Sequence, residues 1–229
     1  MNFSSFDNRK YPILAVPEGY AEWVTTYEHT VLDEMDIRLL ERIRTVRWQA
    51  ARRVVDLACG TGRTGAWLAK RGVRSIDGID ITPEMLAVAR NKGIYRQLVI
   101  GDVTRLPFVS ETFDVAVQAL ADEHLSDLVS LYQDVARITK ANGSFVIVGY
   151  HSHFLMLGIQ THYHRLTGEA VAIKSYVHLL SDHVKAAQAA GWTLRAMDES
   201  VIDEDWISKK PEWAKYYHHP VSFSMVWQK

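Results

Sequence analysis

The sequence has little cysteine and no long apolar run. Cys59 is the only cysteine among 229 residues, so no disulfide can form within the chain. The first twenty residues lack the continuous apolar stretch of an export signal. No segment approaches the roughly 18–20 consecutive apolar residues that a membrane-spanning helix needs. We therefore predict a cytoplasmic protein without a membrane partner.

An excess of either charge is also missing. The chain has 26 Lys and Arg against 27 Asp and Glu, which gives a formal net charge of −1. Proteins that bind nucleic acid through their overall field carry a clear positive excess, and this chain does not. We predict no nucleic-acid partner and expect a small-molecule ligand instead. Nothing in the composition indicates an oligomeric state.

Short apolar runs alternate with helical patterns from residue 54 onward. This alternation is typical of β-α-β units, whose parallel strands are buried between two layers of helices. We predict an α/β fold, doubly wound and Rossmann-like, with a seven-stranded, mostly parallel sheet. The last run alternates in polarity, as an antiparallel or edge strand would. The expected strands are 54–58, 75–80, 97–102, 113–118, 144–150, 193–202 and 221–229.

Helices are expected between these strands and ahead of them. Thr82 and Pro83 begin one helix, and Ser126 begins another that should end near Asn142 and Gly143. A further helix is expected over 181–191. Ahead of the sheet, aromatic and apolar residues recur at helical spacing, which fits a packed helix, a lid over a ligand, or both. We expect one domain over 1–229, with a helical lid or extension (1–50), a cofactor-binding half (51–150) and an acceptor-side segment with the final strands (151–229).

The segment VVDLACGTGRTG contains the spacing G-x-G-x-x-G at Gly60, Gly62 and Gly65. Glycines in this pattern after a strand are typical of nucleotide-binding turns. Asp56 lies four residues before the first glycine. A carboxylate about 6 Å from a pyrophosphate would oppose each phosphate charge by roughly 3 kcal/mol at an effective dielectric near 20. The aspartate therefore favours a positively charged ligand over a dinucleotide.

Acidic residues stand at the ends of the first three expected strands. Asp80 follows Gly60 by 20 residues, the spacing at which a carboxylate binds a ribose diol. Asp102 ends the next run and could accept a hydrogen bond from an adenine amino group. Ligands of open parallel sheets bind outside the carboxyl ends of the strands. Together with Asp56, these residues predict a site for an adenosine that carries a cation.

The segments DLACGTGRTG, GIDITPEML, GDVTRLPF, FDVAVQALADEHLSD and TKANGSFVIV resemble those of the class I S-adenosylmethionine-dependent methyltransferases, particularly the type 11 small-molecule enzymes. The resemblance covers about residues 50–150 clearly. It implies that S-adenosylmethionine is the cofactor. It also implies which residues hold each part of that molecule: Asp56 and the backbone of Ala58, Gly60 and Gly62 for methionine, Asp80 for ribose, Ile81, Asp102 and Val103 for adenine, and Gln118 and Ala119 beside the sulfonium.

The chain departs from the usual pattern of this family in two places. Lys140 to Gly143 read K-A-N-G where many members have K-P-G-G, although an Asn-Gly pair also makes a tight turn. Glu123 and His124 stand where many members have two histidines. The second departure leaves the acceptor chemistry open.

Histidines gather after the fifth expected strand, in the segment 150–169. The resemblance places 150–180 over the methyl acceptor. A general base is needed only if the acceptor is still protonated, and histidine suits that role near neutral pH. We take His124, His151 and His153 as the candidate catalytic residues. The cluster lacks cysteine and the ligand spacing of a zinc site, so we expect no metal.

The most direct interpretation is methyl transfer from S-adenosylmethionine to an O, N or C nucleophile of a small molecule, by in-line displacement. Two alternatives remain open. A non-catalytic module that binds S-adenosylmethionine would share the cofactor motifs, since the acceptor side is the least recognisable part. An NAD-dependent oxidoreductase would share the glycines but would place Asp56 beside phosphate.

Overall fold

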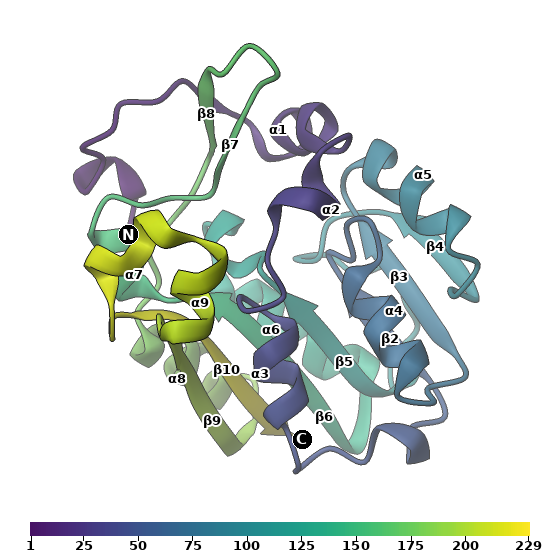
Figure 1. Ribbon diagram of the computed structural model, residues 1–229. Helices are drawn as coiled ribbons and strands as arrows, with labels where there is room; N and C mark the ends of the chain where they lie inside the picture. Colours follow the sequence, from purple (N-terminus) through teal and green to yellow (C-terminus); the bar gives the residue numbers. More distant parts are fainter.

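The computed structural model describes residues 1–229 and is built around a seven-stranded sheet (Figure 1). The strand order is β4-β3-β2-β5-β6-β10-β9. Strands β2 to β6 run parallel, and β10 runs antiparallel to both of its neighbours. The order reverses between β2 and β5, where open α/β sheets bind their ligands. The bounds are β2 Val54–Leu57, β3 Ile76–Asp80, β4 Gln97–Ile100, β5 Phe113–Ala119, β6 Thr139–Tyr150, β9 Thr193–Val201 and β10 Pro220–Gln228.

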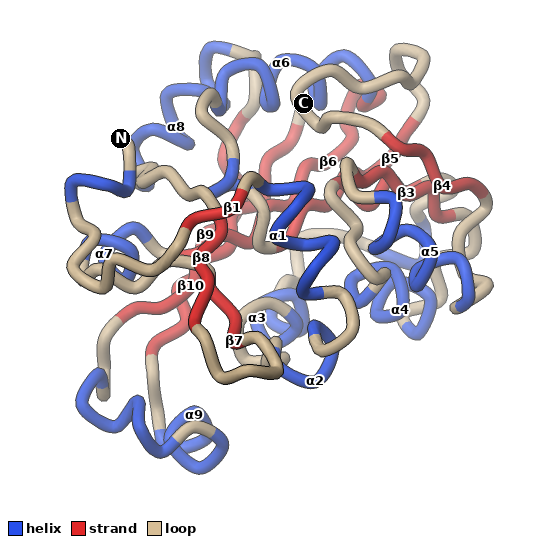
Figure 2. The backbone as a smooth tube through the Cα atoms, turned by 90° about the horizontal axis from the view of Figure 1, so that it is seen from above, coloured by secondary structure: helices blue, strands red, loops and turns tan.

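Helices cover both faces of this sheet, which confirms the predicted doubly wound fold (Figure 2). One face packs against α6 and α8 around Tyr132, Phe145 and Trp227. The other packs against α3 and α4 around Leu40 and Trp67. None of the helices is both long and apolar enough to span a bilayer. The helices are α1 Val16–Trp23, α2 Tyr27–Thr30, α3 Ile37–Arg42, α4 Arg63–Lys70, α5 Pro83–Asn91, α6 Leu128–Ile138, α7 Ser152–Met156, α8 Leu180–Ala189 and α9 Glu204–Lys209.

The last strand, β10, is antiparallel as expected but is not an edge strand. It lies between β6 and β9, and every residue from Val221 to Trp227 is buried. The alternation in its sequence comes from Ser222 and Ser224, which are both buried. Serine is small enough to face a packed layer, so the alternating polarity did not mark a solvent face here. The edge strands of the sheet are β4 and β9.

Two helix boundaries differ from the sequence expectation. Helix α6 begins after Asp127, whose carboxylate accepts hydrogen bonds from the backbone of Val129 and Ser130, so Asp127 and not Ser126 is the cap. At its other end, β6 starts directly after the helix. Asn142 has a positive φ of 62° and lies inside this strand, where residues 140–143 fall between the pairs Phe113–Thr139 and Val115–Ser144 and interrupt the ladder with β5.

The N-terminal segment and the segment after α7 pair with each other. Strand β1 (Ile13–Leu14) lies parallel to β8 (Ala170–Ile173), which in turn pairs with β7 (His162–His164). Such short strands were not predicted. Figure 1 shows β7, β8 and α1 together at the top of the molecule, above the main sheet. We call residues 13–43 the N-terminal cover, and the interpretation of this segment as a lid over a ligand stays a prediction.

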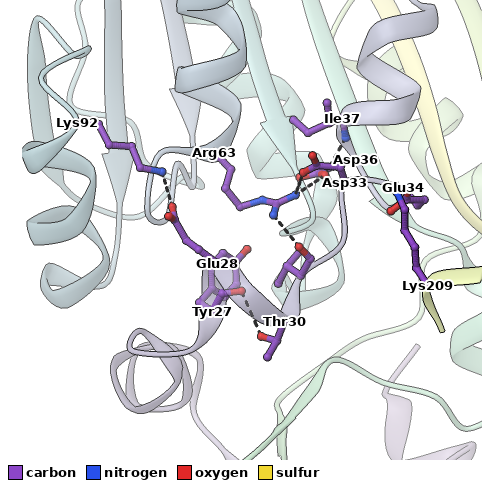
Figure 3. A network of polar contacts seen from close by, with 11 residues as sticks. Tyr27, Glu28, Thr30, Asp33, Glu34, Asp36, Ile37, Arg63, Lys92 and Lys209 are labelled. Carbon is purple, nitrogen blue, oxygen red and sulfur yellow. Dashed lines mark hydrogen bonds and ion pairs between the residues drawn. The ribbon is translucent and has the colours of Figure 1, made fainter. Parts of the chain in front are cut away.

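Charged residues fasten the N-terminal cover to the rest of the protein (Figure 3). Arg63 of α4 donates to Asp33 and Asp36, each at 2.9 Å, and to the carbonyl of Val31 at 2.7 Å. In the same network Lys92 of α5 pairs with Glu28, and Lys209 of α9 pairs with Glu34. The cover is thus anchored from several separate helices.

Candidate functional site

A cavity lies at the carboxyl ends of β2, β3, β4 and β5, beneath the N-terminal cover. Seven of the ten predicted cofactor residues line it: Ala58, Gly60, Asp80, Ile81, Asp102, Val103 and Ala119. The other lining residues are Val16, Tyr20, Tyr27, Thr82, Met85, Gly101, Leu120, Ala121, His124 and Leu125. We call it the first cavity. Residues from four strand ends meet there because the carboxyl ends of parallel strands share one edge of the sheet.

The turn after β2 brings backbone to the wall of this cavity. Ala58 and Gly60 both have positive φ, 51° and 52° respectively. A non-glycine residue in this conformation costs about 1–3 kcal/mol and is found mainly at functional sites. No heavy atom lies within 4 Å of the position that a Cβ on Gly60 would occupy, so the backbone there faces open space. The turn can therefore approach a ligand closely.

Asp80 at the end of β3 holds the glycine turn in place. Its Oδ2 accepts from the backbone N–H of Gly60 at 2.8 Å, and its Oδ1 accepts from the N–H of Thr82 at 2.8 Å. The side chain is 7% exposed, and burial raises its pKa. Each carboxylate oxygen keeps a lone pair for a ligand. Asp80 thus combines a structural bond to the turn with acceptor capacity in the cavity.

Asp102 and its neighbours form the far wall of the first cavity. Oδ1 of Asp102 accepts from both the backbone N–H and the hydroxyl of Thr104, each at 2.8 Å, which fixes the carboxylate and leaves Oδ2 without a protein partner. Ile81, Val103 and Met85 line the same cavity. An apolar slot with one oriented carboxylate suits a flat base with an exocyclic amino group.

Asp56 lies behind the glycine turn and not on the cavity wall. Its side chain is 1% exposed and accepts a hydrogen bond from the hydroxyl of Tyr95 at 2.6 Å. Burial raises the pKa of Asp56 to about 7, although the bond from Tyr95 opposes the rise. Any attraction between this carboxylate and a bound cation therefore acts through the turn.

Tyr95 explains the glycine spacing that sequence reasoning assigned to a nucleotide. A Cβ on Gly65 would lie 2.2 Å from the Tyr95 hydroxyl oxygen, and one on Gly78 would lie 3.0 Å from its ring. A Cβ on Gly62 would also lie 3.0 Å from that ring. The later glycines make room for a buried tyrosine that reaches Asp56. Only their lack of side chains signals this in the sequence, and sequence reasoning missed Tyr95.

Gln118 near the end of β5 is fully buried, and neither its amide oxygen nor its nitrogen has a partner. It does not line the first cavity, whereas its neighbour Ala119 does. Gly62 likewise faces Tyr95 and not the cavity. Asp56, Gly62 and Gln118 are therefore the three predicted cofactor residues that the fold places behind the wall, and their predicted roles stay predictions.

A second and larger cavity of about 700 Å³ adjoins the first. Pockets of about 300–1,000 Å³ are typical of small-molecule sites. Its walls come from the N-terminal cover, from residues 159–164 and from α9 with the turn that follows. Tyr20, Tyr27 and Leu120 line both cavities. Leu120 has a positive φ of 54° at this junction, directly after β5.

His124 is the one candidate catalytic residue at the cavities. Its Nδ1 lies 2.8 Å from the carbonyl oxygen of Lys174, and because a carbonyl only accepts, Nδ1 carries a proton. In the neutral ring Nε2 is then an acceptor, and the Tyr20 hydroxyl donates to it at 2.9 Å. Burial raises the pKa of Tyr20 well above its usual range, so Tyr20 keeps its proton and acts as donor.

Glu123 lies beside His124 and lines the second cavity. It is 2% exposed, its Oε1 accepts from the Thr161 hydroxyl at 2.9 Å, and its Oε2 has no partner. Burial raises the pKa of this carboxyl, and the nearby His124 opposes the rise. Its Oε1 lies 3.6 Å from His124 Nε2, close enough to stabilise a protonated imidazole. Sequence reasoning noted Glu123 as a departure without giving it a role.

His151 and His153 lie outside both cavities. His151 caps α7 through its Nδ1 and contacts Glu199 through Nε2 at 2.7 Å. His153 contacts His219 at 3.1 Å, and burial together with His219 lowers its pKa. The structure therefore does not bring these histidines to His124. No group of three or more His, Cys, Asp or Glu side chains is arranged to hold a metal ion.

Residues 55–147 match the family model described as a methyltransferase domain. This match covers less than half of the chain. The biotin biosynthesis bifunctional protein BioHC of Saccharophagus degradans is 33% identical over 117 residues, which cover 49% of this chain and 20% of that protein. A demethylmenaquinone methyltransferase of Corynebacterium kroppenstedtii is 35% identical over 95 residues, which cover 42% of this chain and 40% of that protein.

A solved structure is similar in fold to nearly the whole chain. It is an S-adenosylmethionine dependent methyltransferase from Mesorhizobium loti, with a TM-score of 0.63 and 20% identity, covering 93% of this chain and 99% of that one. At this identity the likeness shows the fold. The match to curated relatives spans less than half of their length.

The raised pKa of Asp56 predicts how stability varies with pH. Because the folded pKa is about 7 and the ordinary value is 3.8, folding favours the protonated acid. This contribution is complete below pH 4 and is lost as the pH rises through 7. We expect Asp56→Asn to gain on the order of 2 kcal/mol over the wild type between pH 5 and pH 8. Urea unfolding at both pH values measures this, and an equal difference at the two would contradict it.

Proposed function

We propose that this protein transfers a methyl group from S-adenosylmethionine to a small-molecule acceptor. The observation that carries the proposal is the meeting of two cavities at Tyr20, Tyr27 and Leu120, at the switch point of the sheet. The first cavity is lined by seven of the ten residues that the family resemblance assigns to the cofactor. The second has room for another molecule. Relatives named for demethylmenaquinone and biotin biosynthesis support a small-molecule acceptor.

The residues of the first cavity fit S-adenosylmethionine. Asp80 would accept hydrogen bonds from the ribose hydroxyls, and Asp102 would accept one from the adenine amino group while Ile81 and Val103 hold the ring. Ala58 and Gly60 would bring backbone to the methionine part. Burial raises the pKa of Asp56. A nearby ammonium would oppose this rise, because a positive charge favours the ionised carboxylate. When bound, S-adenosylmethionine supplies a methyl group activated by an adjacent sulfonium.

The Asp80–Gly60 bond favours this cofactor over a dinucleotide. In dinucleotide-binding folds the backbone N–H groups of the glycine turn face the pyrophosphate. Here the Gly60 N–H already donates to Asp80 at 2.8 Å. A phosphate at the same N–H would have to displace this carboxylate and lie beside its charge. The alternative of an NAD-dependent oxidoreductase is therefore the weaker one.

The protein's part in the reaction is alignment and removal of a proton. Holding the reacting atoms in line can contribute about 7–11 kcal/mol to lowering the barrier. For an acceptor that carries a proton, we propose a relay at the junction of the cavities. Tyr20 takes the acceptor's proton as it passes its own to Nε2 of His124, and Glu123 stabilises the imidazolium that forms. The carbonyl of Lys174 keeps the ring in the orientation this requires.

Parallel titration with S-adenosylhomocysteine and with NAD tests the proposed cofactor. We expect calorimetry to show binding of the first and none of the second. Incubation with S-adenosylmethionine and a panel of small acceptors, with release of S-adenosylhomocysteine as the signal, tests turnover. Binding without any turnover would favour a non-catalytic module, and binding of NAD alone would overturn the proposal.

Asp80→Asn is expected to weaken S-adenosylhomocysteine binding about ten- to hundredfold, because a hydrogen bond to a charged group is worth about 1.5–3 kcal/mol. The new amide N–H₂ would also face the N–H of either Gly60 or Thr82. Asp198→Asn is the matched control, since Asp198 lies on β9, pairs with Arg42 and lines neither cavity. Calorimetry on both variants measures the change, and similar affinities would contradict the role of Asp80.

A further inference from the structure

The second cavity has a distinct cationic end. Arg9 and Lys210 both line it. The Arg9 guanidinium lies 5.7 Å from the centre of the Tyr11 ring, and Lys210 Nζ lies 4.1 Å from the centre of the Trp213 ring. Neither cation has a carboxylate within salt-bridge distance, unlike Arg63, which has two. Two cations that lie near aromatic rings in a cavity wall are suited to bind the anionic group of a ligand.

His162 lies near both of these cations. Its Nδ1 donates to the carbonyl of Gln160 at 2.7 Å, so its Nε2 is the acceptor for Arg9 at 3.3 Å. Burial, together with the charges of Arg9 and Lys210, lowers the pKa of His162 to about 4, although the bond to Gln160 opposes the change. The imidazole is therefore neutral and does not add a third positive charge beside Arg9 and Lys210. Glu212 also lines this end but is exposed and makes no ion pair with Lys210.

The remaining walls are aromatic, with buried polar atoms that lack partners. Trp23, Tyr150 and Trp206 line the cavity between its ends. Gln160 is 2% exposed, and neither its oxygen nor its nitrogen has a partner. With the free Oε2 of Glu123, it offers hydrogen bonds to a molecule in the second cavity. Unpaired buried polar groups cost about 1–3 kcal/mol each, so a ligand that satisfies them gains from it.

We propose that the acceptor is a planar, aromatic molecule with an anionic substituent, which is held by Arg9 and Lys210 while the methyl-accepting group lies toward Glu123 and His124. The anion is a carboxylate or a phosphate, which the two cations bind alike. This inference rests on the proposed function, because the second cavity is the acceptor site only if the first holds the cofactor. It adds the chemical class of the acceptor and the orientation in which the acceptor lies in the second cavity.

The test uses three probes of one shape: a hydroxynaphthoate, the corresponding hydroxynaphthyl phosphate, and dihydroxynaphthalene as the neutral counterpart. Each is titrated calorimetrically into the protein saturated with S-adenosylhomocysteine, so no turnover is required. We expect at least one anionic probe to bind about tenfold more tightly than the neutral one, as a charge-assisted contact would give. The stronger of the two anionic probes identifies the anion.

Arg9→Gln and Lys210→Met are expected each to remove most of that advantage and to leave binding of the neutral probe unchanged. Arg44→Gln and Lys215→Met are the matched controls. Arg44 contacts the carbonyl of Glu41, Lys215 lies over Tyr216, and neither lines a cavity. An unchanged affinity for S-adenosylhomocysteine shows that each variant is folded.

Equal binding of anionic and neutral probes by the wild type would overturn this inference, as would an anionic preference that survives both cavity variants. Either result would leave the proposed function intact as long as S-adenosylhomocysteine binds. Failure of S-adenosylhomocysteine to bind would instead overturn the proposed function itself, and the two failures are thus distinguishable.

Discussion

Arg63→Met is expected to lower the free energy of unfolding by about 3–5 kcal/mol, the usual cost of removing one partner from a buried ion pair. Asp36 is 3% exposed, and burial raises its pKa while Arg63 holds that rise in check. Without the guanidinium, a buried carboxylate and the Val31 carbonyl lose their donor (Figure 3). Methionine keeps the apolar stem, so the loss is electrostatic. Urea unfolding at neutral pH measures it.

The matched control is Lys92→Met, which breaks the more exposed pair with Glu28. Exposed pairs contribute about 0–1 kcal/mol, so this variant should unfold close to the wild type. A double variant with Asp36→Asn should recover much of the loss, because no uncompensated charge is then buried. If Arg63→Met costs no more than Lys92→Met, the cover is not anchored by Arg63. Loss of the anchor should also weaken S-adenosylhomocysteine binding, because Tyr20 and Tyr27 of the cover line the first cavity.

His124→Gln is expected to lower kcat about 10²- to 10⁴-fold, the range that general base catalysis contributes. Glutamine can replace the hydrogen bonds to Tyr20 and to the Lys174 carbonyl in part, but it cannot accept a proton. The affinity for S-adenosylhomocysteine should change little, since His124 is not among the proposed cofactor contacts. Steady-state release of S-adenosylhomocysteine, with an acceptor found in the panel, measures the effect.

His153→Gln is the control for this substitution. His153 makes its contact with His219 outside both cavities, and its replacement should leave kcat unchanged. Tyr20→Phe should lower kcat as well, because it removes the hydroxyl that connects the acceptor with His124 Nε2. Turnover by His124→Gln within a factor of a few of the wild type would contradict the relay. An equal loss in His153→Gln would show that the effect is not specific to the junction.

The strand-end residues that line the first cavity were predictable because their positions are set by local sequence. A buried strand followed by a carboxylate places that carboxylate at one edge of the sheet, so Asp80 and Asp102 could be located from their position after β3 and β4. The glycine turn was equally clear. The role of its last glycine was not clear from the sequence. Gly65 lacks a side chain because Tyr95, a residue 30 positions further along the chain, occupies that space. Nothing in the sequence near Tyr95 signals that contact.

The second cavity was less predictable, because residues from segments far apart in the chain line it. His124 could be proposed as a titratable residue after β5, but His151 and His153 had the same claim from the sequence. Tertiary structure alone separates them, because α7 turns the latter two toward Glu199 and His219. Arg9 and Lys210 line one cavity although about 200 positions separate them in the chain. No spacing could have paired them.

The sequence by itself determined the doubly wound sheet and the carboxylates at its strand ends, because apolar runs, helical periods and the residues after each strand are local properties. Only the tertiary structure decided which strand lies between β6 and β9, and that β1 pairs with β8 across 159 positions. Such pairings depend on which surfaces remain uncovered once the parallel core has formed. The cover, and with it the second cavity, therefore follows from packing.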